Sequence, residues 1–136
     1  MLDWQDPERV RFMLDECTTW AVVGLSGDPS RTAYSIASLL QSRGKRIVPI
    51  HPDGPTVLGE QGYATLAEVP FPVDVVDVFR RSEAAGAFAD QAVAVGARAV
   101  WFQLGVVDEE AFDRTLAAGV AMVMDTCPAI EWRRRG

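Results

Sequence analysis

The segment from Trp20 to Arg43 constrains the fold of this chain more than any other part of the sequence. It begins with an apolar run that predicts a β-strand, Trp20 to Val23, breaks at Gly24, passes through a small polar turn and continues into an amphipathic helix. A strand, a glycine turn and a helix in this order direct free backbone N–H groups and the positive end of a helix dipole toward one point. Such a point binds anions, most often phosphate, so the segment predicts a nucleotide-like ligand.

The rest of the chain alternates between apolar strands and helices. The predicted strands are continuous apolar runs, which is typical of strands covered on both faces of a sheet; they span 20–23, 46–50, 73–79, 99–103 and 120–124. The predicted helices span 7–16, 31–43, 83–95, 109–118 and 128–134. Ser82 and Asp108 are expected to cap two of them, and the capping-box spacing of Thr65 and Glu68 predicts one more helical turn. This alternation predicts an α/β fold, a Rossmann-like, doubly wound, mainly parallel five-stranded sheet with helices on both faces.

The length of the chain, 136 residues, predicts a single domain that spans residues 1–136 and buries its own core. Its apolar runs are much shorter than the roughly 18 residues that cross a membrane. The first twelve residues lack the basic and apolar regions of a signal peptide, so we expect a cytoplasmic protein. The 19 Asp and Glu against 13 Lys and Arg, a net charge of −6, disfavour non-specific binding to nucleic acid. The basic run Arg133 to Arg135 is interpreted as a solvated tail.

The predicted architecture also indicates where a ligand binds. In doubly wound sheets, ligands bind beyond the carboxyl ends of the strands, near the switch point beside the first strand. The segments that follow the predicted strands are therefore the candidates for a site: 24–31, 50–52, 79–81, 103–106 and 125–127.

The turn from Gly24 to Ser30 matches part of the dinucleotide-binding fingerprint. Gly24 occupies the first glycine position of that motif, whereas Ser26 stands at the second and Pro29 at the third. The Ser26 hydroxyl can donate a hydrogen bond to a phosphate, and proline is favourable at the start of a helix. We interpret the turn as a phosphate or pyrophosphate site, with a tight turn that binds nothing as the alternative.

The end of the second strand disfavours a nicotinamide cofactor. Such sites usually place an acid there to hold the ribose hydroxyls, but this strand ends Ile50-His51-Pro52 and the nearest acid, Asp53, lies inside the turn. His51, the only histidine, is either a contact for a phosphate or ribose or a turn residue without a ligand.

Polar residues follow the third and fourth predicted strands. Arg80 either pairs with a phosphate in a bidentate manner or is exposed to solvent, and for Arg81 we expect exposure. Gln103 is expected to present its amide to a ligand or to a neighbouring loop. Asp74 and Asp77 are interpreted as residues that flank a strand, without an acid–base role.

The two cysteines, Cys17 and Cys127, are interpreted as small buried apolar residues. Cys127 follows the last strand, and a nucleophilic role would need a base to activate it. Only His51 is available, and it could serve only if the two strand ends converge. We assign no catalytic residue and no metal ligand.

Five motifs in a fixed order give the chain a family resemblance. They are AVVGLSGDPSR at 21–31, VPIHP at 48–52, VDVVDVFR at 73–80, WFQLGV at 101–106 and MDTCPAIE at 124–131. With these motifs the chain, from about Thr19 to Trp132, resembles the small stand-alone CoA-binding proteins. These are relatives of the CoA-binding N-terminal domain of the succinyl-CoA synthetase α subunit.

The resemblance implies a Rossmann-like fold that binds coenzyme A through its ADP and pantetheine parts. It implies that the loop 24–30 holds the diphosphate, that 51–52 lies near the adenosine, that 78–80 lines one side and that 103–105 approaches the pantetheine. The expected ligand-binding residues are Gly24, Ser26, Gly27, Asp28, Pro29, Ser30, Arg31, His51, Pro52, Val78, Phe79, Arg80, Gln103, Leu104 and Gly105. His51 departs from the family, which often has Asn there. The phosphohistidine and second domain of the synthetase have no counterpart, so its reaction is not predicted.

Three functions follow as hypotheses. The first is a non-catalytic module that binds coenzyme A or an acyl-CoA as a carrier or sensor. The second is an oxidoreductase or redox regulator that binds NAD(P), and the third is an interaction module without a ligand. A homo-oligomer and an unknown protein partner are both left open.

Overall fold

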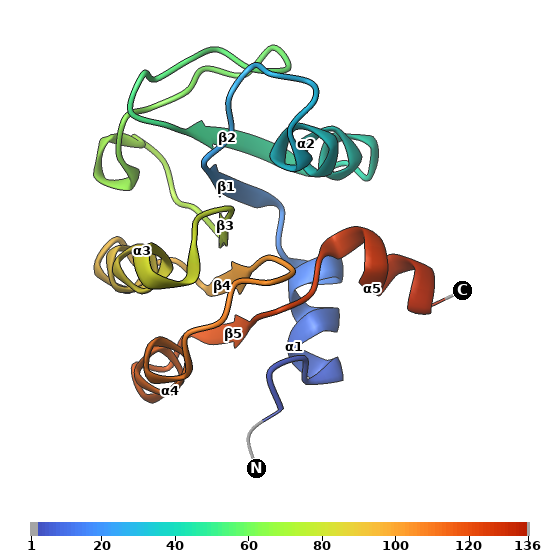
Figure 1. Cartoon of the computed structure of the whole chain (residues 1–136), viewed down its shortest axis with the longest axis vertical. Coiled ribbons are helices and arrows are strands. Elements are labelled where there is room, and N and C mark those ends of the chain that lie inside the picture. The colour runs from blue at the N-terminus through green and yellow to red at the C-terminus, as the bar shows by residue number, and fades with distance from the viewer. Residues whose placement is uncertain (1–2, 136) are drawn as a thin grey trace.

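The structure is a computed structural model that describes residues 3–135. Its centre is a sheet of five parallel strands in the order β2-β1-β3-β4-β5 (Figure 1). The strands are β1 (Thr19–Val23), β2 (Arg46–Ile50), β3 (Val75–Val78), β4 (Ala99–Phe102) and β5 (Ala121–Val123). The predicted doubly wound α/β fold is confirmed. The order changes direction between β1 and β3, which places the switch point next to the central strand.

Helices cover both faces of this sheet. They are α1 (Pro7–Arg11), α2 (Thr32–Ser42), α3 (Ser82–Ala94), α4 (Glu109–Ala117) and α5 (Pro128–Arg134), together with the π-helical η1 (Phe12–Glu16) and the 3₁₀ turn η2 (Leu66–Glu68). Figure 1 shows α3 and α4 on one side of the sheet and α1, α2 and α5 on the other. Within the part of the chain that the structure describes, no helix is both long and apolar enough to span a membrane.

The two faces of the sheet explain the continuous apolar runs of the strands. Toward α3 the sheet presents mostly aliphatic residues against Ala85, Ala89 and Ala92, whose small side chains let the helix pack closely. On the opposite face Trp20 and Trp101 pack against each other, with ring centroids 5.7 Å apart. Both indole N–H groups donate to backbone carbonyls, so burying these rings leaves neither N–H without a partner.

The N-terminal helix follows the predicted span, but its second half is π-helical rather than α-helical. Asp6 caps its start by accepting from the N–H of Arg9 at 3.1 Å. Lys45 satisfies its end, since its Nζ donates to the carbonyls of Leu14 and Cys17 at 2.6 and 2.7 Å. Cys17 itself is fully buried, as expected, and this burial raises the pKa of its thiol to about 11.

Two of the predicted caps are wrong and one is confirmed. Thr65 makes no capping hydrogen bond, and Glu68 accepts instead from the N–H of Ala64, so no capping box forms. Ser82 is the first residue of α3 rather than its N-cap, because its hydroxyl is used by the loop that follows β4. Asp108 does cap α4, accepting from the N–H of Ala111 at 3.0 Å.

The basic C-terminal run is not simply a solvated tail, which corrects the interpretation from sequence. Its last two arginines are partly exposed but paired: Arg134 contacts Glu131 at 3.0 Å, and Arg135 makes two hydrogen bonds to Asp15 at 2.6 and 3.0 Å. The second pair joins the two ends of the described chain. The Asp15–Arg135 pair is partly exposed on both sides and contributes little to stability. Glu131 of the other pair is buried and also accepts from the Thr126 hydroxyl.

Candidate functional site

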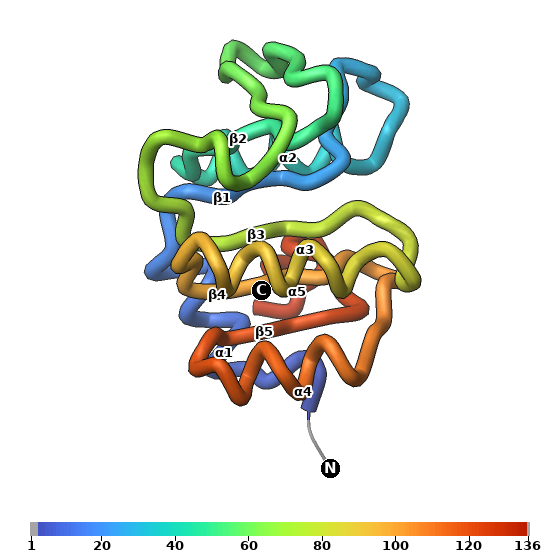
Figure 2. The backbone as a smooth tube through the Cα atoms, turned by 90° about the vertical axis from the view of Figure 1, so that its left-hand side faces the viewer, coloured from blue at the N-terminus to red at the C-terminus, as the bar shows by residue number. Residues whose placement is uncertain are grey.

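A row of backbone hydrogen bonds joins the carboxyl ends of all five strands. In each bond, a residue just after one strand donates to the last carbonyl of its neighbour: Gly24 to Ile50 (2.8 Å), Phe79 to Val23 (3.0 Å), Gln103 to Val78 (3.3 Å) and Asp125 to Phe102 (3.1 Å). The segments predicted to carry the site therefore follow one another along a single edge of the sheet. Figure 2 shows the loops that follow β1 and β3 leaving the sheet at this same end.

Gly24 allows the turn after β1 to pass close to the end of β3. Its φ is +94°, a conformation that residues with a side chain rarely adopt. A Cβ at this position would lie 2.8 Å from the backbone oxygen of Phe79. The glycine is therefore required both by the backbone conformation and by the approach of two strand ends at the switch point.

The start of α2 has unpaired hydrogen-bond donors. Arg31 occupies the N-cap position and makes no capping hydrogen bond through its side chain. Within residues 3–135, the N–H groups of Gly27, Thr32 and Ala33 have no protein acceptor. Free N–H groups at the positive end of a helix dipole form an anion-binding site. Thr32 and Ala33 were not among the residues expected from sequence, because a motif match names side chains whereas these donors belong to the backbone.

Asp28 and Ser30 interact with each other at the tip of this turn. The Asp28 carboxylate accepts from both the N–H and the hydroxyl of Ser30, at 3.0 and 2.7 Å. These hydrogen bonds hold the pKa of Asp28 below its usual value. Ser26 accepts from the N–H of Asp28 at 3.3 Å and keeps its own hydroxyl proton for another partner. Among the three side chains, Ser26 is thus the one best placed to donate to a phosphate.

The other predicted residues after β2 and β3 differ in how they can contribute. His51 is half-buried and its Nδ1 accepts from the N–H of Asp53 at 3.2 Å, so Nε2 remains as the donor. Val78 is fully enclosed in the core under α3, which corrects its expected role as a lining side chain. Phe79 is half-buried and Arg80 is exposed, with its guanidinium 5.9 Å from the ring of Phe88.

The loop after β4 is held by hydrogen bonds on both sides. Gly105 donates to the carboxylate of Asp125 at 2.8 Å, and Ser82 donates to the carbonyl of Gly105 at 3.3 Å. Val107 donates in turn to the Ser82 hydroxyl at 2.9 Å. Leu104 projects from this fixed loop with 63% of its surface exposed. An exposed leucine on a rigid loop at the strand ends suits contact with an apolar part of a ligand.

Gln103 is oriented by a partner that the sequence interpretation did not consider. Its Nε2 donates to the carboxyl oxygen Oδ1 of Asp77, and both side chains are buried. Asp77 lies in the middle of β3 and is completely enclosed, so its interpretation as a strand-flanking residue is wrong. Asp74 does flank the strand, since its carboxylate accepts from the N–H groups of Thr18 and Thr19. Burial raises the pKa of Asp77 to about 8.

Cys127 and His51 do not converge. They follow β5 and β2, which are the two opposite edges of the sheet. Four strand spacings of roughly 4.8 Å put these edges about 19 Å apart. Cys127 is half-buried rather than buried and stands at the N-cap position of α5. A Cys–His dyad is therefore excluded.

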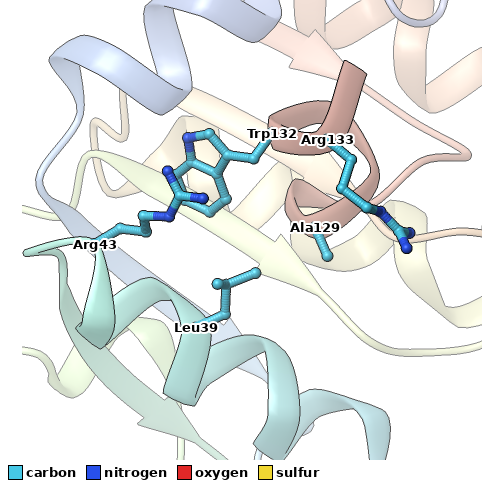
Figure 3. Close-up of a pocket in the computed structure, with 5 residues that line it drawn as sticks. All are labelled: Leu39, Arg43, Ala129, Trp132 and Arg133. Atoms are coloured by element: carbon cyan, nitrogen blue, oxygen red, sulfur yellow. The ribbon is translucent and has the colours of Figure 1, made fainter. Parts of the chain in front are cut away.

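A separate groove of about 410 Å³ lies between α2 and α5 (Figure 3). Its lining residues are Leu39, Arg43, Ala129, Trp132 and Arg133. The guanidinium of Arg43 lies over the indole ring of Trp132, 4.7 Å from its centroid. Leu39 and Arg43 belong to the C-terminal end of α2, whereas the glycine turn leads into its N-terminal end. The groove is thus distinct from the crevice at the strand ends.

Parallel strands, a doubly wound order and a glycine turn at the switch point define a Rossmann-like domain. The chain belongs to the CoA binding domain family, whose model matches residues 18–133. This result confirms the resemblance on which the expected site was based.

Other proteins share the sequence and the fold of this chain. The uncharacterized protein YneT of Bacillus subtilis (strain 168) is 34% identical over 125 residues, covering 90% of this chain and 93% of its own length. A hypothetical protein from Pyrococcus horikoshii OT3 superposes with a TM-score of 0.87 at 30% identity, covering 98% of this chain and 92% of that one. A dinucleotide-forming acetyl-coenzyme A synthetase 1 from Ca. Korarchaeum cryptofilum, in complex with phosphate and ADP, gives a TM-score of 0.72 at 25% identity. That match covers 81% of this chain but 26% of the synthetase.

Proposed function

We propose that this protein binds coenzyme A or an acyl-CoA as a non-catalytic binding, carrier or sensor module in the cytoplasm. The observation that carries the proposal is the combination, at one strand end, of the Gly24 turn and the uncapped start of α2. In a member of the CoA binding domain family, such an anion site suits the diphosphate of the coenzyme.

The order of the strands gives each part of the coenzyme a neighbouring loop. The diphosphate would lie over the N–H groups of Gly27, Thr32 and Ala33. The adenosine would extend toward His51, whose loop is adjacent because β1 pairs with β2. The pantetheine arm would extend the other way, across Phe79 toward the loop of Gln103, along the row of strand ends.

The arrangement of reactive side chains supports a binding role rather than a catalytic one. Cys127 and His51 lie at opposite edges of the sheet, and the Cys17 thiol is buried with a raised pKa. A nucleophile needs an adjacent base or a lowered pKa to react. His51 lies too far from Cys127 to act as its base, and burial raises the pKa of Cys17. An NAD(P)-dependent role gains no support from the end of β2, where Asp53 is exposed and turned toward His51.

Isothermal titration of the wild-type protein, Arg80→Ala and Arg81→Ala with CoA, ADP and NAD tests this proposal. We expect CoA to bind the wild type more tightly than ADP or NAD. Arg80→Ala should weaken CoA binding by about 1–3 kcal/mol, roughly 5- to 150-fold, as expected for a charge-assisted hydrogen bond to phosphate. Arg81→Ala is the matched control, because that side chain is 85% exposed and faces Glu83 at 3.6 Å.

Two results would count against the proposal, and a third would change only the role given to Arg80. Binding of NAD with no binding of CoA would favour the dinucleotide hypothesis. No binding of any ligand by folded protein would favour the interaction module. Equal CoA affinity of Arg80→Ala and Arg81→Ala would remove Arg80 from the site while leaving CoA binding intact.

A further inference from the structure

A buried acid–amide pair lies where β3 and β4 reach their carboxyl ends. Asp77 is in the central strand β3, and Gln103 is the first residue after β4. Asp77 has no exposed surface and Gln103 has 4%, and the only hydrogen bond between them runs from Gln103 Nε2 to Asp77 Oδ1. In register, Asp77 lies between Val22 of β1 and Trp101 of β4, so its surroundings on the sheet are apolar.

This pair costs stability. The other carboxyl oxygen of Asp77, Oδ2, is enclosed and has no partner within the described residues. Burial raises the pKa of Asp77 and the hydrogen bond from Gln103 lowers it, and no charged side chain among residues 3–135 acts on it. An enclosed polar atom without a partner destabilises the folded state, so packing alone does not account for an aspartate here.

The hydrogen bond fixes which atom of the Gln103 carboxamide is engaged within the protein. Because Nε2 is bound to Asp77, the oxygen Oε1 is the carboxamide atom that remains for another partner. Oε1 accepts no hydrogen bond from residues 3–135. Two polar side-chain atoms of these residues are both enclosed and without a partner, Asp77 Oδ2 and Thr115 Oγ1, and Oε1 is not one of them. It is therefore the atom of the pair that reaches solvent at the strand ends.

We propose that Asp77 is a positioning residue of the ligand site: by accepting from Gln103 Nε2, it holds Gln103 Oε1 toward the crevice as an acceptor for an amide N–H of the pantetheine arm. The inference rests on the proposed binding of coenzyme A and names the part of the coenzyme that this end of the site recognises. Without Asp77 the Gln103 carboxamide can flip and present its NH₂ group to the ligand. Two donors would then face each other, and the hydrogen bond to the ligand's N–H would be lost.

Affinities for two ligands separate this role from a purely structural one. CoA carries the pantetheine arm and ADP does not, so a positioning defect should affect CoA alone. Asp77→Asn retains an acceptor for Gln103, so its CoA affinity should stay within about 3-fold of the wild type. Asp77→Val removes the acceptor, so it should lower the CoA affinity by about 5- to 20-fold and leave the ADP affinity unchanged. Gln103→Ala should lower the CoA affinity as much as Asp77→Val does. The double variant should lose no more than either single variant, because both substitutions remove the same hydrogen bond.

The contrary results are distinct. CoA affinity unchanged in Asp77→Val, or equal losses for CoA and ADP, would overturn the inference while leaving CoA binding intact. Wild-type protein that binds no CoA would overturn the proposed function and the inference with it.

A second measurement does not depend on the ligand or on the stability of Asp77→Val. The side-chain NH₂ signals of Gln103 in ¹H–¹⁵N spectra should shift with a midpoint near pH 8 in the wild type, since burial raises the pKa of Asp77 to about 8. They should not shift in Asp77→Asn. Signals that are insensitive to pH in the wild type would contradict a titrating carboxyl of Asp77 in contact with Gln103.

Discussion

Replacing Gly24 with alanine will destabilise the fold by about 2–4 kcal/mol, since it combines backbone strain with a steric clash. The φ of +94° is strained for any residue with a side chain, and the new Cβ would lie 2.8 Å from the backbone oxygen of Phe79. That oxygen belongs to the end of β3, where the N–H of Phe79 is bound to Val23, so it cannot move without separating two strands. Urea unfolding monitored by tryptophan fluorescence measures the loss.

Two other glycines provide matched controls for this variant. Gly44 has a φ of +81°, but a Cβ added there would meet no atom within 4 Å, so Gly44→Ala carries the strain without the clash. It should lose about 1 kcal/mol, and the difference from Gly24→Ala isolates the clash. Gly27→Ala introduces neither backbone strain nor a steric clash, so its free energy of unfolding should stay unchanged. It should bind CoA more weakly if the diphosphate lies against this turn. Equal unfolding energies for Gly24→Ala and Gly44→Ala would contradict the close approach of the two strand ends.

Replacing Asp77 with asparagine will stabilise the protein, and the gain will grow with pH. Asp77 has its pKa raised from 3.8 to about 8 by burial, so between these values the folded state binds one proton that the unfolded state has released. The free energy of unfolding of the wild type therefore falls as pH rises through this range, by up to about 1.4 kcal/mol per pH unit. Asparagine keeps the hydrogen bond from Gln103 and has no proton to lose.

Urea unfolding of both proteins at pH 5, 6, 7 and 8 measures this effect. We expect the advantage of Asp77→Asn at pH 8 to exceed its advantage at pH 5 by about 2–4 kcal/mol. Taking the difference between the two proteins cancels the contributions of the titrating groups that they share. Stability curves that run parallel with pH would show that Asp77 does not stay protonated in the folded state.

The fold was predictable because strand and helix periods alternate without interruption. Continuous apolar runs indicated strands buried on both faces, and the helix over 128–134 was predicted with its observed limits. The third strand was predicted too long, because Val73 and Asp74 lie outside β3 and only its central four residues pair. The π-helical half of the N-terminal helix could not be predicted, since its carbonyls are satisfied by Lys45, a residue distant in sequence.

The place of the candidate site was predictable from the fold, and its hydrogen bonds were not. Its location follows from topology, because the first residues after parallel strands must meet at one edge. The buried state of Asp77 could in principle have been predicted: an acid in the middle of a central parallel strand has no solvent-facing side to occupy. Its pairing with Gln103 could not, because it depends on the lateral order of β3 and β4. The free N–H groups at the start of α2 depend on which side chains fail to cap it, which only the three-dimensional structure reveals.

The most direct test of the central claim, that the crevice at the strand ends holds coenzyme A, is a ¹H–¹⁵N spectrum of the labelled protein with and without CoA. We predict that the largest shifts fall on the backbone amides of 24–33, 79–80 and 103–105. Shifts confined to the groove of Leu39, Arg43 and Trp132, or no shifts at saturating CoA, would contradict the claim.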